Sequence, residues 1–347
     1  MPAEQIVEVA GRRLKMTNLE KVLYPATGFT KGQVIDYYAR IAPVLVPHLT
    51  GKPLTLKRYP GGVDAQFFFE KNATKHRPDW VQTAPIWSEG NQREINYILA
   101  NDLATMVWLA NLAAIELHPS LSLARDMACP RTLVFDLDPG PPANIVQCCQ
   151  VGTWLRAIFE HFKLESFPKT SGSKGLQIYV PLNTKTTYEE TKAFAHATAR
   201  LLENEHRNLI VSDMKKAIRE NKVFVDWSQN DEHKTTISVY SLRARERPTV
   251  STPVTWEEVG RALKKKDASL LVFDANQVLK RVEKIGDLFA PMLALKQKLP
   301  NLQSLVGKTK VAGTEVEIAA QAEAPSRTAG AGKTKRAARP RKRRQKV

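Results

Sequence analysis

Two aspartates lie inside a short apolar segment near the middle of the chain. Residues 133–140 read Leu-Val-Phe-Asp-Leu-Asp-Pro-Gly, so Asp136 and Asp138 alternate with apolar residues. An apolar run that ends at Pro-Gly is typical of a buried strand. Because side chains alternate along a strand, the two aspartates should share one face while Phe135 and Leu137 occupy the other. The chain must therefore fold around a sheet with paired carboxylates on one face.

A third aspartate, Asp226, has similar surroundings, because it follows the apolar residues 223–225 and precedes Trp227. Carboxylates gathered on a sheet cost free energy unless something positive neutralises them. A pair of divalent cations would do so, and two such ions catalyse phosphoryl or nucleotidyl transfer. The alternative is that Asp-x-Asp simply ends a strand and that Asp-Pro-Gly is turn chemistry.

A glycine-rich basic turn separates the two aspartate segments. Residues 171–175 are Ser-Gly-Ser-Lys-Gly, and backbone N–H groups in such a turn can hold phosphate oxygens while Lys174 adds a charge. The glycine spacing of a Walker A loop is absent. Short Gly-Ser turns with one lysine are more often only turns, so both interpretations stand.

The charge of the chain indicates a polyanionic partner. The net charge is +17, and residues 326–347 contain ten Lys or Arg and no acid. Removing these ten charges leaves +7 on residues 1–325, so the body is basic without its tail. Nucleic acid is the expected partner, and the tail should add non-specific affinity. Three cysteines without ligand spacing, and the lack of a membrane-length apolar run, favour a cytoplasmic, nucleoid-associated protein with no membrane partner.

The order of predicted elements is mixed, which favours an α/β (mixed α+β) enzyme. We expect one catalytic domain over residues 1–299, then a linker and a disordered basic tail over residues 300–347. The predicted helices are 34–45 with Thr30 as N-cap, 102–117 ending at His118-Pro119, 144–162, 188–205, and several between 256 and 299. The predicted strands are 54–60, the two aspartate segments, 176–182 and 235–242.

Basic and aromatic residues outside these motifs have two interpretations each. Lys57, Arg58 and Arg243 are normally solvated, but they could reach a triphosphate. A lone His118 is more often structural than catalytic. Phe68 and Phe69 would normally be core, but between turn-forming segments they could stack on a base. Lys21 and Lys31 flank a Tyr-Pro turn and could hold a phosphate.

At this point the sequence resembles a known family, the polymerase domain of bacterial ligase D within the archaeo-eukaryotic primase superfamily. The resemblance covers roughly residues 15–290, and no ligase or nuclease module accompanies it, as in a stand-alone Prim-PolC-like member. The matching segments, in order, are 21–28, 56–60, 68–71, 116–118, 133–140, 170–176, 223–230, 234–236 and 240–243. The resemblance implies a primase-type core with central sheets flanked by helices.

The resemblance also implies roles for individual residues. Asp136, Asp138 and Asp226 match the catalytic, metal-binding carboxylates, with two ions of Mn²⁺ or Mg²⁺ as cofactors. The implied binding residues are Lys57, His118, Ser171, Lys174, Gln177 and Arg243 for the NTP or dNTP, and Lys21, Lys31, Arg58, Phe68, Phe69 and Arg219 for DNA. Lys21 and Lys31 match a pocket for the 5′-phosphate of a gap.

The implied activity is DNA-dependent nucleotidyl transfer that fills short gaps or recessed ends in end joining or excision repair, with a preference for manganese and ribonucleotides. The expected partners are gapped or broken DNA with a 5′-phosphate and a DNA ligase or end-binding repair protein, and we expect a monomer.

Gln177 departs from the family pattern, which has His at this position. Gln cannot carry a charge at neutral pH, so weaker triphosphate binding or an altered pH profile is expected. A non-catalytic DNA-end binding or bridging protein and a two-metal nuclease remain alternatives.

Overall fold

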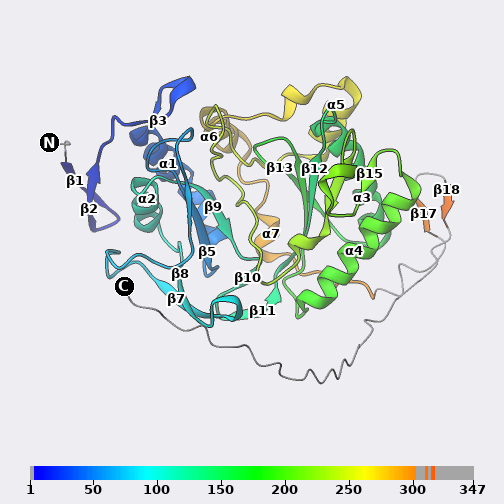
Figure 1. The fold of residues 1–347 in the computed structure, drawn as a ribbon, viewed down its shortest axis with the longest axis horizontal. Helices are drawn as coiled ribbons and strands as arrows, with labels where there is room; N and C mark the ends of the chain where they lie inside the picture. Colours follow the sequence, from blue (N-terminus) through cyan, green and yellow to red (C-terminus); the bar gives the residue numbers. More distant parts are fainter. Residues whose placement is uncertain (1–3, 302–308, 312–313, 317–347) are drawn as a thin grey trace, which may run out of the picture.

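Two sheets, each with its own helices, form two halves that lie side by side (Figure 1). The computed structural model describes residues 4–301, 309–311 and 314–316. The first sheet has the order β13-β14-β12-β16-β15, and all pairs are antiparallel except β15 with β16. Its strands are β12 (Thr132–Pro139), β13 (Phe167–Thr170), β14 (Leu176–Pro181), β15 (Ile210–Val211) and β16 (Val223–Asp226).

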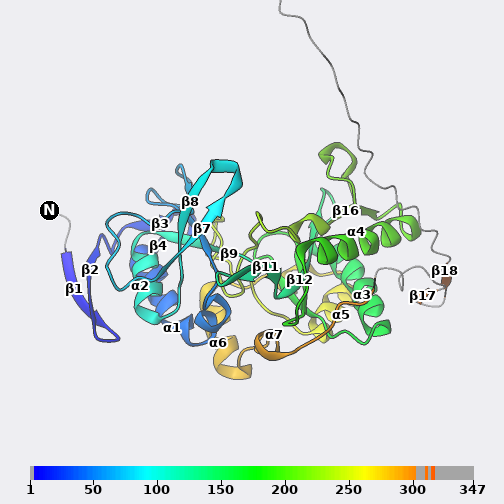
Figure 2. The same ribbon diagram turned by 90° about the horizontal axis from the view of Figure 1, so that it is seen from below.

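One face of this sheet is buried under helices. They are α3 (Ile145–His161), α4 (Tyr188–Glu205) and α5 (Trp256–Lys265). Leu133, Phe135 and Leu137 of β12 belong to a buried apolar cluster that residues of all three helices complete. Alternation along β12 therefore sends Asp136 and Asp138 to the other face, which turns toward the second half (Figure 2).

The second half is built on the N-terminal residues. Its sheet contains β5 (Leu54–Arg58), β6 (Phe68–Glu70), β7 (Thr83–Ser88), β8 (Arg93–Ile98) and β9 (Ala114–Pro119), with β5 paired to β6, β8 and β9. The helices α1 (Lys31–Leu49) and α2 (Leu103–Asn111) pack on it, and α6 (Ala275–Ile285) and α7 (Pro291–Ala294) lie between the halves. The remaining strands form hairpins: β1 (Glu4–Val9) with β2 (Arg12–Thr17), β3 (Val22–Tyr24) with β4 (Phe29–Thr30), β10 (Ser122–Leu123) with β11 (Asp126–Pro130), and β17 (Thr309–Val311) with β18 (Thr314–Val316).

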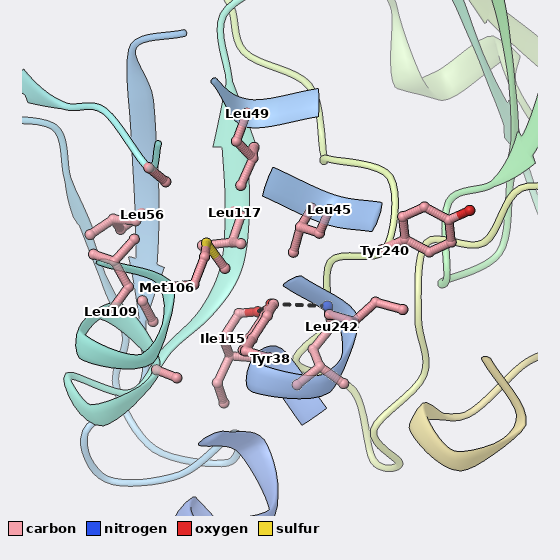
Figure 3. Packing of buried hydrophobic residues seen from close by; sticks show 14 of the residues in the cluster. Tyr38, Leu45, Leu49, Leu56, Met106, Leu109, Ile115, Leu117, Tyr240 and Leu242 are labelled. Carbon is pink, nitrogen blue, oxygen red and sulfur yellow. Dashed lines mark hydrogen bonds between the residues drawn. The ribbon is translucent and has the colours of Figure 1, made fainter. Parts of the chain in front are cut away.

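The core of the second half ties distant segments together through Tyr38. This α1 side chain is buried, and its hydroxyl donates to the carbonyl of Ile115 on β9 at 2.6 Å. The same hydroxyl accepts from the N–H of Leu242 at 3.1 Å (Figure 3). Leu242 precedes Arg243, so the core of α1 and β9 positions a predicted site residue.

Several predicted elements are confirmed. Thr30 caps α1 by accepting from the N–H of Gln33, and the Gln33 side chain completes a capping box. Helix α4 has the predicted bounds 188–205, and α3 follows its N-cap Asn144. Strands β5, β12, β14 and β16 lie where the sequence placed them.

Three predicted elements are wrong. The helix predicted over 102–117 ends at Asn111, because Ala113 has a φ of 55° and residues 114–119 pair with β5 instead. His118 therefore lies on strand β9 rather than at a helix end. Residues 235–242 form no regular strand, since the chain turns at Tyr240, whose φ is 61°. The C-terminal helices stop at Ala294 rather than continuing to 299.

Among the described residues, no helix is both long enough and apolar enough to cross a lipid bilayer. Within the predicted linker the structure describes residues 300–301 and the hairpin of β17 and β18. The predicted basic tail, residues 326–347, lies outside the described residues.

Candidate active site

Two of the three predicted catalytic aspartates lie in one row across the first sheet, and the third lies beside that row. The Cα atoms of Asp136 and Asp226 are paired across β12 and β16. On the other side of β12, Asp136 is paired with Gln177 of β14, which is in turn paired with Lys169 of β13. Paired residues project to the same face of a sheet. The register thus places Lys169, Gln177, Asp136 and Asp226 side by side, with Asp138 further along β12.

Burial and mutual repulsion shift the pKa values of these carboxyls. Burial, followed by the charge of Asp138, raises the pKa of Asp136 to about 7. Burial also raises the pKa of Asp138, against the opposing charges of Lys174 and Arg219. Both raised pKa values mean that ionising these carboxyls costs free energy in the folded protein, and a bound cation would offset that cost.

The donor chemistry of the three aspartates suits a hard divalent cation, since Mg²⁺ and Mn²⁺ prefer carboxylate oxygens. The buried Oδ1 of Asp136 has no hydrogen-bond partner among the described residues. Asp226 differs, because Oδ1 accepts from the N–H and hydroxyl of Ser228 and Oδ2 from Gln229. In the part of the chain that the structure describes, no three His, Cys, Asp or Glu side chains converge as a preformed metal site. The residues fit the ions by chemistry and by their shared face.

The glycines of the basic turn allow close backbone packing beside Asp138. A Cβ on Gly175 would lie 2.3 Å from the carbonyl oxygen of Leu137 on β12, and a Cβ on Gly172, whose φ is 66°, would lie 2.5 Å from the backbone of Val250. The Ser171 hydroxyl accepts from the N–H groups of Ser173 and Gly175, which shapes the turn. Lys174 is exposed, and its charge opposes the rise that burial causes in the pKa of Asp138, so the turn presents a cation to the aspartates.

A Gly175→Ala substitution should destabilise the protein by about 1–3 kcal/mol, the usual cost of overpacking a close contact. The new methyl group would displace the turn from β12 and with it Lys174. Thermal unfolding measures the loss, and the matched control is Gly260→Ala on α5, where a Cβ meets nothing within 4 Å. That control should gain up to about 1 kcal/mol, because Ala favours a helix over Gly. Equal stabilities for the two variants would contradict the predicted packing.

Glu116 of β9 is the centre of a second set of charged residues. Its side chain is buried, and its two oxygens contact Arg243 Nε at 3.2 Å and His118 Nε2 at 3.0 Å. Burial opposes ionisation, but the His118 hydrogen bond and the charges of Arg243, His118 and Lys57 prevail and lower the pKa of Glu116 to about 2. Arg243 also donates to the carbonyl of Ser171 at 2.5 Å. The predicted residues Lys57, His118, Ser171 and Arg243 therefore lie together, where the two halves meet.

The strand pair β5–β6 divides the aromatic and basic candidates into two groups. Phe69 is paired with Lys57, and its ring lies 6.4 Å from that of His118, on the nucleotide side. Phe68 is paired with Arg58, whose guanidinium carbon lies 5.0 Å from the centre of the Phe68 ring. Both rings are about half exposed, as a stacking role requires.

A third group of positive charge surrounds Lys31. Burial, then the charges of Lys21 and Arg58, lower the pKa of Lys31 to about 8. The Lys31 amine donates to the carbonyl oxygen and hydroxyl of Thr17 and has no acidic partner among the described residues. Arg58 is compensated, because its guanidinium pairs with Glu70 at 2.7 Å. Lys21 and Lys31 therefore form the candidate anion site, with Arg58 beside them. Arg219 lies apart from these cations, and its charge opposes the rise in the pKa of Asp138. Its backbone packs closely on Gly140 at the end of β12, where a Cβ would overlap the Arg219 carbonyl.

The family model for the LigD primase-polymerase domain matches residues 30–289. The chain belongs to this family. Among relatives, the multifunctional non-homologous end joining protein LigD of Mycolicibacterium smegmatis is 40% identical over 303 residues, which cover 86% of this chain and 39% of that protein. The bifunctional non-homologous end joining protein LigD of Bacillus subtilis is 32% identical, over 79% of this chain and 43% of that protein. The chain thus spans less than half the length of these curated relatives.

A solved structure has the same fold. The polymerase domain of Mycobacterium tuberculosis ligase D, in complex with DNA, superposes with a TM-score of 0.75 at 37% identity and covers 82% of this chain and 99% of that one. The mixed α/β architecture and the predicted family are therefore confirmed. The LigD primase-polymerase family is one of template-dependent nucleotidyltransferases.

Within this LigD primase-polymerase chain, two buried ionisable residues belong to the site although no sequence motif predicted a role for them. Lys169 is fully buried and donates to Gln177 Oε1 at 2.5 Å and to Ser251 at 2.6 Å. Glu116 connects Arg243 to His118. An ionisable residue inside an apolar strand pattern is the signal that could have marked Glu116. The role of Lys169 could not be predicted from local sequence, because its partners are Gln177 on β14 and Ser251, which is 82 residues away.

Proposed function

We propose that this protein is a DNA-dependent nucleotidyltransferase that fills short gaps or recessed ends during DNA repair. The observation that supports it most is the row of aspartates beside a basic turn and an Arg243–Glu116–His118 network. Three neighbouring carboxylates suit two divalent ions, and the adjacent cations suit a triphosphate. A nuclease site would need the carboxylates but not the triphosphate-binding cations.

Each group of residues has a distinct part in this proposal. Asp136, Asp138 and Asp226 would hold two ions, Mn²⁺ or Mg²⁺, which when bound activate the primer 3′-hydroxyl and neutralise the leaving pyrophosphate. Lys174 binds phosphate oxygens through its charge. The N–H groups of Ser171, Ser173 and Gly175 are engaged within the turn, so those of Gly172 and Lys174 are the ones that can add hydrogen bonds to phosphate. Arg243 and Lys57 stabilise the negative charge that develops on the leaving group.

His118 orients the network rather than acting as a free base. Burial lowers its pKa, although the hydrogen bond to Glu116 opposes the shift. A neutral imidazole at physiological pH can donate one hydrogen bond and accept another. With Glu116 on one nitrogen, the other nitrogen is free to contact the nucleotide. Gln177 contributes a neutral hydrogen-bonding group, whose Oε1 accepts from Lys169. Weaker triphosphate binding or an altered pH profile, compared with a histidine at this position, stays a prediction.

All the DNA-facing residues except Arg219 lie on the second half. Lys21, Lys31 and Arg58 would bind the 5′-phosphate at the downstream side of a gap, and Phe68 and Phe69 would stack on bases. Arg219 would contact the primer-template close to Asp138. The neighbouring structure of a ligase D polymerase domain contains DNA. We infer that gapped or broken DNA is the substrate, that a ligase or end-binding protein acts beside this one, and that the chain acts as a monomer.

Primer extension on DNA with a short gap and a 5′-phosphate tests the proposal. Reactions with Mn²⁺ and Mg²⁺, and with ribonucleotides and deoxyribonucleotides, should show metal-dependent lengthening, faster with Mn²⁺ and ribonucleotides. Shortening of the primer would instead indicate a nuclease. Tight binding without extension would indicate a DNA-end binding or bridging protein, for which the engaged oxygens of Asp226 are the supporting observation.

A Lys21→Ala substitution should reduce the preference for a 5′-phosphate over a 5′-hydroxyl by about tenfold, the loss of one charge-assisted contact of about 1.4 kcal/mol. Lys21 is exposed, so the variant should fold normally. The ratio of Kd values for the two gapped DNAs is the measurement. The matched control is Lys264→Ala on the exposed side of α5, which removes the same charge elsewhere. If the Kd ratio changes equally in Lys21→Ala and in Lys264→Ala, the 5′-phosphate does not bind at Lys21.

A further inference from the structure

A cavity of about 580 Å³ lies between the two halves, apart from the aspartates. Its walls come from the end of α1, the connection from β9 to β10, the start of β12, and α7. Thr132 of β12 lines it, whereas Asp136 lies further along the same strand, about 13 Å away at roughly 3.3 Å per residue. The volume is in the range of pockets that bind small molecules, about 300–1,000 Å³.

The charged residues that line this cavity are all basic. They are Lys52, Arg125, Arg131 and Lys169, and the described lining contains no Asp or Glu. The amine of Lys169 already donates to Gln177 and Ser251, and Arg131 Nε donates to Asn183 at 3.2 Å, which leaves the other guanidinium nitrogens of Arg131 for a ligand. Among the described residues, the Lys52 amine has neither an ion pair nor a hydrogen bond, and burial, then the charge of Arg131, lowers the pKa of Lys52 to about 8. His48 on the same wall differs, since Asp287 pairs with it at 2.8 Å. A concave surface with charge of one sign concentrates ions of the opposite sign.

The rest of the lining is apolar with a few hydroxyls. Leu121, Phe289 and Met292 supply apolar surface, and Ser120 and Ser238 supply hydrogen-bonding groups. Such a lining suits a ligand with a flat or apolar body as well as a charged group. A free inorganic ion would use the cations and leave the apolar wall unoccupied.

We propose that this cavity binds a small phosphorylated molecule of mononucleotide size, with its phosphate at Lys52 and Arg131 and its body against Leu121, Phe289 and Met292. Arg125, in the exposed turn between β10 and β11, stands at the same cavity and adds a third cation. Lys169 forms the wall that the cavity shares with the catalytic row. The site is separate from the triphosphate site at Arg243 and does not depend on the proposed polymerase activity.

Labelling with pyridoxal 5′-phosphate tests the site in the full chain without metal or DNA. The probe has a phosphate and an aldehyde; the Lys52 amine adds to the aldehyde, water leaves to form an imine, and borohydride delivers hydride to the imine carbon. Peptide mass analysis separates Lys52 from lysines of the nucleotide site. Lys52 should label at least about tenfold faster with this probe than with pyridoxal, which has the aldehyde but no phosphate, because only an anion site concentrates the phosphorylated probe. Comparing the two probes at one residue removes the effect of the lowered pKa of Lys52 on its reactivity.

Protection by competitors identifies the ligand class. AMP should suppress labelling of Lys52 at concentrations about tenfold below those of inorganic phosphate, since burial of the base adds more than about 1.4 kcal/mol. Labelling of Lys52 no faster with pyridoxal 5′-phosphate than with pyridoxal, or labelling that AMP does not suppress, overturns the site. Equal suppression by phosphate and AMP overturns the role of the apolar wall.

Calorimetry with variants adds a second measurement. Lys52→Gln should remove one of the AMP-binding events of the wild-type chain, while the matched Lys264→Gln control should keep all of them. AMP binding by Lys52→Gln that is identical to wild type refutes the proposal.

Discussion

An Asp136→Asn variant loses roughly a thousandfold of its nucleotide addition, the scale of removing a group that stabilises transition-state charge, and it stays folded. Asn keeps the shape of Asp but cannot neutralise a divalent cation. Burial and the charge of Asp138 raise the pKa of Asp136 to about 7, so the negative charge is unfavourable in the metal-free protein. Removing that charge should leave the free energy of unfolding without metal unchanged or higher.

Single-turnover extension of a gapped primer and urea unfolding in a chelator measure the two effects. Metal should also stabilise the wild type against unfolding and not the variant, because binding to the native state alone raises stability. The control is Asp36→Asn on the solvent face of α1, where an exposed pair with Arg40 at 3.6 Å contributes little. If Asp136→Asn extends the primer as fast as Asp36→Asn does, Asp136 has no part in catalysis.

An Arg243→Ala variant loses about 3 kcal/mol of stability, the cost of leaving a buried partner unpaired. The side chains of Arg243 and Glu116 are 14% and 3% exposed. A loss of this size lowers Tm by roughly 5 °C in a fold of about 300 residues. Adding Glu116→Gln should restore part of the stability, because the uncompensated charge is then gone. The double mutant should still bind nucleotide poorly, since Arg243 is absent.

The pH dependence of unfolding gives an independent check. The pKa of Glu116 lies at about 2 in the native protein against an ordinary value of 4.5. A lowered pKa stabilises the fold at pH values above the ordinary one, and this stabilisation is lost as the pH falls toward 2. Without Arg243 the pKa of Glu116 rises, so the variant should lose its remaining stabilisation at a higher pH than wild type. Identical pH profiles would show that Arg243 is not the counter-charge of Glu116.

Local patterns in the chain were sufficient for several elements. Capping residues Thr30 and Asn144 fixed where α1 and α3 begin, because a side-chain cap satisfies helix N–H groups within a few residues. Alternation placed Asp136 and Asp138 on one face of β12. The prediction failed at residues 112–119, where helix-forming composition gave way to pairing with β5, a partner more than fifty residues away.

The sequence by itself determined the family, the aspartate strands and the basic turn, since these depend on neighbours along the chain. Only the tertiary structure decided which residues meet: Asp136 beside Asp226 and Gln177, Glu116 between Arg243 and His118, and Phe68 and Phe69 on different groups of cations. The physical reason is that sheet register and burial arise from contacts between distant segments. A buried charge such as Lys169 becomes tolerable only through partners that those contacts bring to it.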